Sequence, residues 1–300
     1  MNNKQRIKKA LSKYYHPVKN YLQRSKNKKT IIEFKKDIWQ TDEISQAFIK
    51  GSDSENVIAA AMMDKEVNEF FLAHCKPTDT VLDIGCGHGI VSEFLAQNGI
   101  SVTAADISEK LLDEFRARIA GKNLPVEIVR ADAYKQPFAD NRFDVVVARM
   151  FLPHFPDWPV VLKEMTRVTK PGGKLLVHFC SAENVALGKK IGQHDCTFGT
   201  TPDTINPWVY YADADDKELK KVAASTGLEV VSRTPISFFL NNRLFGYQLG
   251  TDAYNAYIKE MEGFLKDERV KEFVRWFDKN ITSQFSPVLS YLNIITFVKK

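Results

Sequence analysis

The segment VLDIGCGHG at residues 81–89 places an apolar run and an acid directly before three glycines at alternate positions. Such a run is typical of a buried strand, and the glycines permit positive φ angles and close approach of a ligand to the backbone. Because helix-forming residues follow, the pattern predicts a strand–turn–helix unit that binds a nucleotide-like ligand. A dinucleotide fingerprint would need its third glycine at position 90, where Ile90 stands.

Strand-length apolar runs alternate with amphipathic segments from about residue 54 onward. We expect strands at TVLDIG, SVTAADI, PVEIVRAD, FDVVVAR and GGKLLVHF, and later at LEVVSRTPISFF and YLNIITFVKK. Helices are expected between them, the first begun by the cap-forming residues at 52–54. Near-continuous apolar strands separated by helices predict an α/β fold, with a parallel sheet covered on both faces.

Acids stand at the ends of three of these strands. Asp83 ends the first strand, Asp106 the second and Asp132 the third. We expect the strand ends to converge on one ligand, with Asp106 placed for ribose hydroxyls and Asp132 for an amine such as that of adenine. Each acid could instead cap a chain end or a helix.

The charge of the chain is unevenly distributed. Residues 1–30 contain ten Lys or Arg and no acid, which leaves 32 basic and 37 acidic residues in the other 270. The mildly acidic body argues against an extended nucleic-acid groove. The basic head has apolar residues at helical spacing, interrupted by Pro17, and suits either a peripheral contact with an anionic membrane or a solvated tail; an RNA contact is a weaker third option.

The apolar runs are far shorter than the roughly 20 residues needed to cross a bilayer, and no secretory signal is recognised. The four cysteines, at 75, 86, 180 and 196, form neither a CxxC pair nor a metal-ligand spacing. We therefore expect a cytoplasmic protein with reduced thiols and no metal site, peripheral at the inner face of the membrane if the basic head binds lipid.

Two long stretches interrupt the alternation of strands and helices. Residues 181–212 are rich in Gly, Pro, Thr and Asn, whereas residues 241–287 are helical in pattern and rich in aromatic residues. We divide the chain into a basic segment and cap at 1–45 and a main domain at 46–300, whose two inserts form a substrate lid. The aromatic residues would either line an apolar pocket or pack against the body.

Taken together, VLDIGCGHG, AADIS, RADA, FDVVVARM and RVTKPGGKLLV resemble, in order and spacing, the class I S-adenosylmethionine-dependent methyltransferases, particularly the branch that modifies small molecules and lipids. The resemblance covers roughly residues 55–180. It implies a Rossmann-like, seven-stranded, mostly parallel sheet with an antiparallel last strand, helices on both faces and a helical insert before the last strand. It also implies S-adenosyl-L-methionine as cofactor, with S-adenosyl-L-homocysteine as product.

The resemblance assigns residues to the methionine part of the cofactor. The backbone of Gly85, Cys86 and Gly87 would face it, and Asp83 would orient its ammonium group. The carbonyl of Arg149 would contact the same amino group.

A second set of residues is assigned by the resemblance to the adenosine part. Asp106 would hold the ribose diol and Ile107 would pack on the adenine. Asp132 would accept from the adenine amine, and the Ala133 backbone would contact a ring nitrogen.

A sulfonium is a good leaving group, so methyl transfer needs mainly proximity, orientation and exclusion of water. A base helps only where the acceptor must lose a proton. His154, just past the fourth strand, is our first candidate for a catalytic base, although it could instead pack against or cap the next helix. His178, inside a strand, is expected to be a core histidine. Further candidates are His194, Asp195, Tyr210 and Tyr211.

The chain is therefore predicted to transfer a methyl group in line to a small-molecule, lipid-like or glycan-linked acceptor. Nucleic acid is not expected as a partner, because ARMF follows the fourth strand in place of an NPPY-like or Pro-Cys motif. One alternative is an NAD(P)-dependent oxidoreductase, against which Ile90 and the KPGG turn argue. Another is a non-catalytic module of the same fold that only binds the cofactor.

Overall fold

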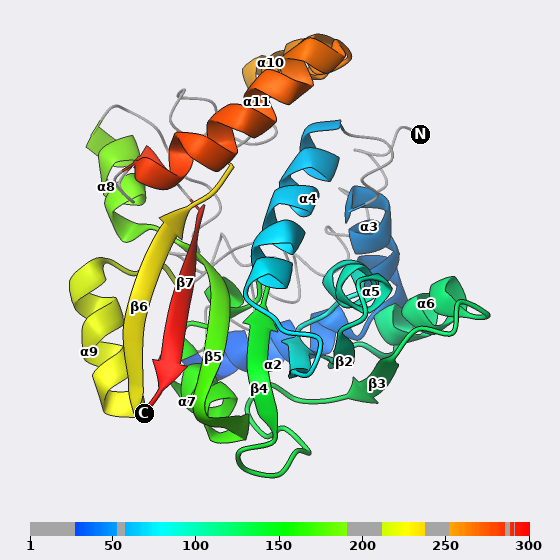
Figure 1. Ribbon diagram of the computed structural model, residues 1–300, viewed down its shortest axis with the longest axis vertical. Helices are drawn as coiled ribbons and strands as arrows, with labels where there is room; N and C mark the ends of the chain where they lie inside the picture. Colours follow the sequence, from blue (N-terminus) through cyan, green and yellow to red (C-terminus); the bar gives the residue numbers. More distant parts are fainter. Residues whose placement is uncertain (1–27, 53–57, 191–211, 238–251, 286–288, 291) are drawn as a thin grey trace.

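The computed structural model describes residues 28–52, 58–190, 212–237, 252–285, 289–290 and 292–300. A seven-stranded sheet runs through its centre in the order β3-β2-β1-β4-β5-β7-β6 (Figure 1). The strands are β1 Thr80–Ile84, β2 Ser101–Asp106, β3 Val126–Arg130, β4 Phe143–Ala148, β5 Thr169–Cys180, β6 Leu228–Pro235 and β7 Leu292–Lys299. β7 is antiparallel to β5 and β6, and the other pairs are parallel. The predicted fold class is confirmed.

Helices precede, connect and follow the strands. They are α2 Lys28–Trp39, α3 Asp42–Ser52, α4 Ile58–Ala73, α5 Ile90–Gln97, α6 Glu109–Ile119, α7 Trp158–Val168, α8 Ala182–Lys190, α9 Asp216–Thr226, α10 Asp252–Phe264 and α11 Glu268–Asn280. Short 3₁₀ turns lie at η2 Leu152–His154 and η5 Thr282–Gln284. The insert predicted at 241–287 is thus helical in its described part.

Apolar side chains pack on both faces of the sheet. Along β1, Leu82 and Ile84 contribute to the layer shared with α7 and α9, and Val81 contributes to the layer shared with α4 and α5. This alternation follows from the two-residue period of a strand, and it explains why the central strands are apolar throughout.

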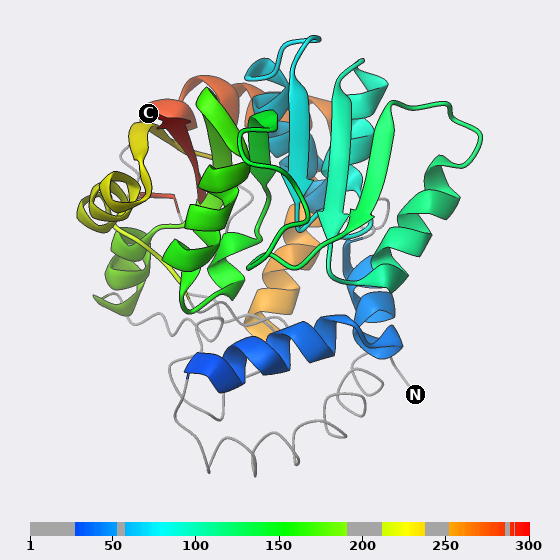
Figure 2. The ribbon, with the colours of Figure 1, turned by 90° about the horizontal axis from the view of Figure 1, so that it is seen from below.

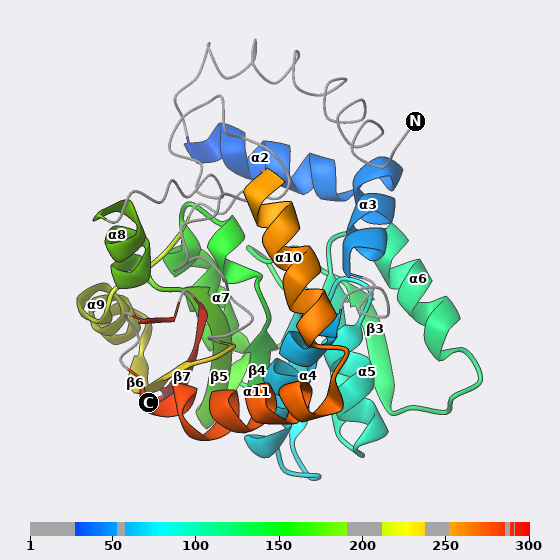
Figure 3. The same cartoon turned by 90° about the horizontal axis from the view of Figure 1, so that it is seen from above.

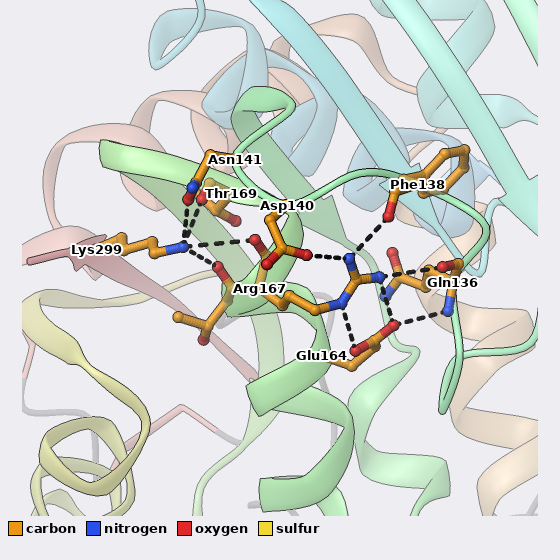
Figure 4. Close-up of polar contacts among 9 residues, drawn as sticks. Gln136, Phe138, Asp140, Asn141, Glu164, Arg167, Thr169 and Lys299 are labelled. Atoms are coloured by element: carbon orange, nitrogen blue, oxygen red, sulfur yellow. Dashed lines mark hydrogen bonds and ion pairs between the residues drawn. The ribbon is translucent and has the colours of Figure 1, made fainter.

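An arginine on α7 fixes the loop that joins β3 to β4. Arg167 donates to the carbonyl oxygens of Gln136 and Phe138 and to the carboxylates of Asp140 and Glu164, at 2.6–3.1 Å (Figure 4). The Lys299 ammonium lies at the end of β7. It donates to the Asn141 side chain in the same loop and to two backbone carbonyls nearby, each at 2.8 Å. The loop between β3 and β4 is therefore held from two sides.

The helical insert is joined to α4 through a side-chain cap. The Glu262 carboxylate on α10 accepts from the N–H groups of Ile58 and Ala59, at 2.8 and 3.0 Å, which are the first two of α4. Figure 3 shows α10 crossing above α4. The cap predicted at 52–54 lies largely outside the described residues, and a residue about 200 positions away supplies an acceptor for this helix end instead.

Helices α2 and α3 lie beyond the carboxyl ends of the strands, as the opposed views of Figures 2 and 3 both show. The boundary predicted at residue 45 falls inside α3, where the Ser45 hydroxyl lies 3.1 Å from that of Ser108, the N-cap of α6. The division into domains remains a prediction.

Several predicted features lie outside the described residues. They are the basic head over residues 1–27, His194, Asp195, Cys196, Tyr210 and Tyr211. The three cysteines that are described, Cys75, Cys86 and Cys180, are not in disulfide bonds. Within the described part of the chain, every helix is too short or too polar to cross a membrane.

We expect Glu262→Ala to lower the free energy of unfolding by about 1–2 kcal/mol, because it leaves two N–H groups at the start of α4 without their acceptor. Urea denaturation measures the change. Glu260→Ala, on the exposed side of the same helix, is the control and should leave the urea midpoint unchanged. Equal midpoints for the two variants would contradict the assigned cap.

His178 generates a prediction on acid stability. Its side chain is buried, and neither ring nitrogen has a hydrogen-bond partner among the described residues. Burial, together with the nearby Arg149 cation, lowers the pKa of His178 to about 3. Between pH 6.5, near the pKa of an unfolded histidine, and pH 3, only the unfolded chain binds this proton, so stability falls as the pH falls.

His178→Leu should therefore reduce the dependence of unfolding free energy on pH by about 1.4 kcal/mol per pH unit over that window. Urea midpoints of both proteins at pH 7, 6 and 5 measure the difference. Parallel pH dependences would show that His178 binds its proton equally in the folded and the unfolded chain, and would contradict the lowered pKa.

Candidate active site

A cavity of about 340 Å³ lies at the carboxyl ends of β1 to β4 and is covered by α2 and α3. Its volume falls within the range of small-molecule sites, about 300–1,000 Å³. Every residue that the sequence predicted for the cofactor or as first candidate base lies in its wall: Asp83, Gly85, Cys86, Gly87, Asp106, Ile107, Asp132, Ala133, Arg149 and His154. The topology therefore brings the predicted set together, and the role of each residue remains a proposal.

The glycine turn between β1 and α5 is bonded to the neighbouring strand. The N–H groups of Gly85 and Cys86 donate to the Ala105 carbonyl at 2.8 and 3.1 Å. Gly85 and Gly87 have φ angles of 71° and 56°, a region that side chains disfavour. The backbone conformation of the turn therefore favours glycine at both positions, whether or not a ligand binds there.

Aromatic rings provide a second reason for these glycines. A Cβ atom on Gly85 would lie 2.0 Å from a ring carbon of Phe151, and one on Gly87 would lie 3.0 Å from a ring carbon of Phe48 on α3. From the sequence, this space was expected to hold a ligand, and neither ring was predicted to lie there. Nothing in their sequence positions links them to the turn.

Asp83 and Asp106 form the buried acidic floor of the cavity. The Asp83 carboxylate accepts from the Ser92 hydroxyl at 2.6 Å, and burial raises its pKa to about 6. The Asp106 carboxylate accepts from the N–H groups of Gly87 and Ser108, both at 2.9 Å. Burial raises the pKa of Asp106 as well, against the effect of these hydrogen bonds.

Asp132 lies at the more open side of the cavity. One carboxylate oxygen accepts from the N–H of Tyr134 at 3.0 Å, and the other from the Lys36 ammonium at 2.5 Å. That ammonium also lies 4.6 Å from the centroid of the Tyr134 ring. Helix α2 is thus tied to the strand end where we expected the adenine.

The chain after β4 turns sharply at the cavity. The Arg149 guanidinium pairs with the Asp64 carboxylate of α4, and Arg149 also lines the cavity. Met150 follows with φ at 48°, which is uncommon for a residue with a side chain and typical of functional loops. Phe151, next along the chain, then packs over Gly85.

His154 lies on η2 and faces helix α2. Its Nδ1 atom is 3.1 Å from the Lys35 Nζ atom, and its ring meets the Trp39 ring edge to face, with centroids 5.7 Å apart. Lys35 is 5% exposed, and burial lowers its pKa well below the ordinary value. The sequence analysis placed the histidine in the cleft but did not identify either neighbour.

Five residues of α2 and α3 also line the cavity, and none of them was predicted from the sequence: Ile32, Lys35, Lys36, Trp39 and Phe48. The first four follow the i, i+3, i+4, i+7 spacing of one helix face, which was a usable signal. Among the described residues, neither insert contributes to the wall. The assignment of the inserts as a lid therefore remains a prediction.

The chemistry of the wall fits S-adenosylmethionine. Carboxylates at the ends of β1, β2 and β3 offer acceptors, and the ammonium, ribose hydroxyls and adenine amine of this cofactor are all donors. Ile107, Ala131 and Ala133 add an apolar surface suited to the adenine ring. No group of three metal-ligating side chains occurs among the described residues.

Comparison with known proteins gives matches to methyltransferases. A family model described as a methyltransferase domain matches residues 82–177. A demethylmenaquinone methyltransferase from Corynebacterium urealyticum is 43% identical over 101 residues, which are 34% of this chain and 41% of that protein. A ubiquinone biosynthesis O-methyltransferase from Coxiella burnetii is 30% identical over 165 residues, which are 53% of this chain and 67% of that protein.

The chain belongs to the class I S-adenosylmethionine-dependent methyltransferases. It spans only about two fifths of the length of the demethylmenaquinone methyltransferases that it matches. The cofactor predicted from the sequence is confirmed, and the oxidoreductase alternative finds no support.

Solved structures show the same fold at low identity. A chain in the complex of the Haloferax volcanii Trm112 methyltransferase activator has a TM-score of 0.52 and 18% identity, over 88% of this chain and 96% of that one. The cyclase SpnF has a TM-score of 0.50 and 18% identity, over 79% and 80%. Because one of these neighbours is called a cyclase, the fold alone does not fix the reaction.

We expect Asp106→Ala to weaken binding of S-adenosylhomocysteine by about 5- to 150-fold, or about 1–3 kcal/mol, because an acceptor for ligand hydroxyls and the clamp on Gly87 are lost together. Isothermal titration calorimetry measures the affinity. Asp113→Ala, on the exposed face of α6, is the matched control and should bind as the unaltered protein does. An unchanged affinity for Asp106→Ala would refute its place in the site.

Proposed function

We propose that the protein transfers a methyl group from S-adenosylmethionine to a small, largely apolar acceptor. The observation that carries this proposal is the composition of one cavity, in which strand-end carboxylates face the aromatic rings of Trp39, Phe48 and Phe151. The acids suit the donor groups of the cofactor, and the rings suit an apolar or aromatic acceptor.

Bound S-adenosylmethionine supplies a methyl group on a positively charged sulfur that is a good leaving group. The protein has to hold the acceptor in line and exclude water. In this proposal Asp83 and Asp132 bind the two ends of the cofactor and Asp106 its ribose, while Trp39 on α2 covers the cavity. His154 lies where the acceptor would meet these groups.

The class of acceptor is inferred from the cavity and from the names of the relatives. Those names refer to demethylmenaquinone and to ubiquinone biosynthesis. A hydroxylated aromatic ring would match both the apolar wall and a nearby proton acceptor at His154. Glycan-linked acceptors and a non-catalytic module remain the competing hypotheses, and nucleic acid is not proposed as a partner.

We also propose a cytoplasmic location, with the basic head over residues 1–30 in peripheral contact with anionic membrane. An amphiphilic acceptor would be met there. Because α2 begins at Lys28 and covers the cavity, a truncation that tests this idea has to stop at residue 27.

The proposed transfer is tested by incubating the protein with methyl-labelled S-adenosylmethionine and fractionated cell extract. We expect S-adenosylhomocysteine to accumulate and the label to appear in one small, apolar compound identified by mass spectrometry. Calorimetry with S-adenosylhomocysteine and with NADH is the binding control. Cofactor binding without labelled product would favour the non-catalytic module, and label in a glycan fraction would replace the proposed acceptor class.

A further inference from the structure

Lys35 and His154 meet in the cavity although they are 119 positions apart in the chain. Lys35 comes from α2, the helix that covers the site, and His154 comes from the turn after β4. Their side-chain nitrogens are 3.1 Å apart, within hydrogen-bond distance, and both residues line the cavity. The opposite ring nitrogen of His154, Nε2, is not involved in this contact.

We infer that Lys35 and His154 form a proton-accepting pair that activates a hydroxyl acceptor, with His154 as the catalytic base and Lys35 as its positioning and relay residue. This inference rests on the proposed methyl transfer. The acceptor O–H bond breaks, and its proton binds Nε2 of His154. The Nδ1 proton passes to the Lys35 amine, and the electron pair left on the acceptor oxygen forms the new bond to the methyl carbon. The bond between that carbon and the sulfonium sulfur breaks at the same time, and its electron pair stays on the sulfur of S-adenosylhomocysteine.

The surroundings of Lys35 favour an amine that is neutral before the reaction. Its side chain is 5% exposed, and removal from water disfavours the ammonium form, which lowers its pKa. A neutral amine has a lone pair that can accept the Nδ1 proton of His154, whereas an ammonium has none. This proton acceptor favours the histidine tautomer that carries its proton on Nδ1, in which the lone pair of Nε2 can act as a base.

The charge of the cavity also favours this relay. Methyl transfer from a sulfonium removes one positive charge from the site, and protonation of Lys35 restores one. The ionisable groups that line the same cavity are Lys36 of α2, Asp83, Cys86, His88, Asp106, Asp132 and Arg149. The acids among them can stabilise the new ammonium.

The position of Lys35 on the covering helix has a further effect. The pair forms only when α2 lies over the cavity, so the base is completed at the moment when water is excluded. Trp39, one turn further along α2, packs its ring edge to face with the imidazole and holds it toward Lys35. A methyl acceptor would thus be deprotonated only in the closed site.

The test is a side-chain NMR titration of His154 in the protein with S-adenosylhomocysteine bound, with the signal assigned from its absence in His154→Asn. If Lys35 accepts the Nδ1 proton, it stabilises the imidazolium, and Lys35→Met lowers the pKa of His154 by at least half a unit. If Lys35 is instead a permanent ammonium, it repels the imidazolium, and Lys35→Met raises that pKa. An unchanged or raised value overturns the inference.

Lys36→Met is the matched control for the titration, because it removes from the same helix and cavity a cation that pairs with Asp132. Loss of that cation should move the His154 pKa slightly upward, opposite in direction to Lys35→Met. Thermal denaturation and calorimetry with S-adenosylhomocysteine confirm that each variant is folded and binds.

Activity provides a second readout, with the acceptor identified in the labelling experiment. Lys35→Met and His154→Asn should each lower transfer at least tenfold without loss of S-adenosylhomocysteine affinity, and Lys110→Met on the surface of α6 should not. Lys35→Arg, which keeps a charge that it cannot give up, should fail to restore transfer; restoration would show that only a cation is needed. If the unaltered protein transfers no methyl group, the proposed function fails, whereas the titration still decides the pair.

Discussion

The carboxylate of Asp106 joins the two backbone turns that form the floor of the cavity. One oxygen accepts from Gly87 in the turn after β1, and the other accepts from Ser108 at the start of α6. The Ser108 hydroxyl in turn meets Ser45 of α3, so the covering helices are positioned from the same point. A buried carboxylate is costly unless its hydrogen bonds are satisfied, and here the backbone satisfies both oxygens. The positions of the glycine turn, of α6 and of the covering helices all depend on this arrangement.

The sheet could be predicted from the sequence because its strands are nearly continuous apolar runs. Such runs identify buried strands without reference to the rest of the chain. The acids at the strand ends could be predicted to converge because the carboxyl ends of parallel strands lie on one edge. The antiparallel β7 followed only from the family resemblance. Its apolar composition fits a strand buried between β5 and β6 in either direction.

Contacts between remote segments could not be predicted. Lys36 pairs with Asp132 across 96 positions and Glu262 caps α4 across about 200, and no local pattern links either pair. The positive φ of Met150, next to the Phe151 ring that packs over Gly85, likewise has no local signal in the sequence. Residues 1–45 were expected to form a basic segment and cap, but the side chains of α2 and α3 that line the cavity could not be predicted without these contacts, and the substrate lid was expected in the inserts.

In the proposed function, cofactor and acceptor would be recognised by different kinds of structure. The residues proposed for the cofactor lie on strand ends and adjoining turns, whereas the wall opposite is built from α2, α3 and the loop after β4. Such additions can change the reaction while the core stays the same, which is consistent with a cyclase among the structural neighbours. The acceptor is therefore to be sought through Trp39, Phe48 and His154 and their surroundings.

The position of α2 has a consequence for turnover. Two contacts, of Lys36 with Asp132 and of Gln40 with Arg130, hold this helix over the cavity and would have to separate before it could swing away. Their separation would ease the exchange of a bound ligand with solvent. Because both side chains of the Lys36–Asp132 pair are partly exposed, added salt would weaken the pair and ease that exchange.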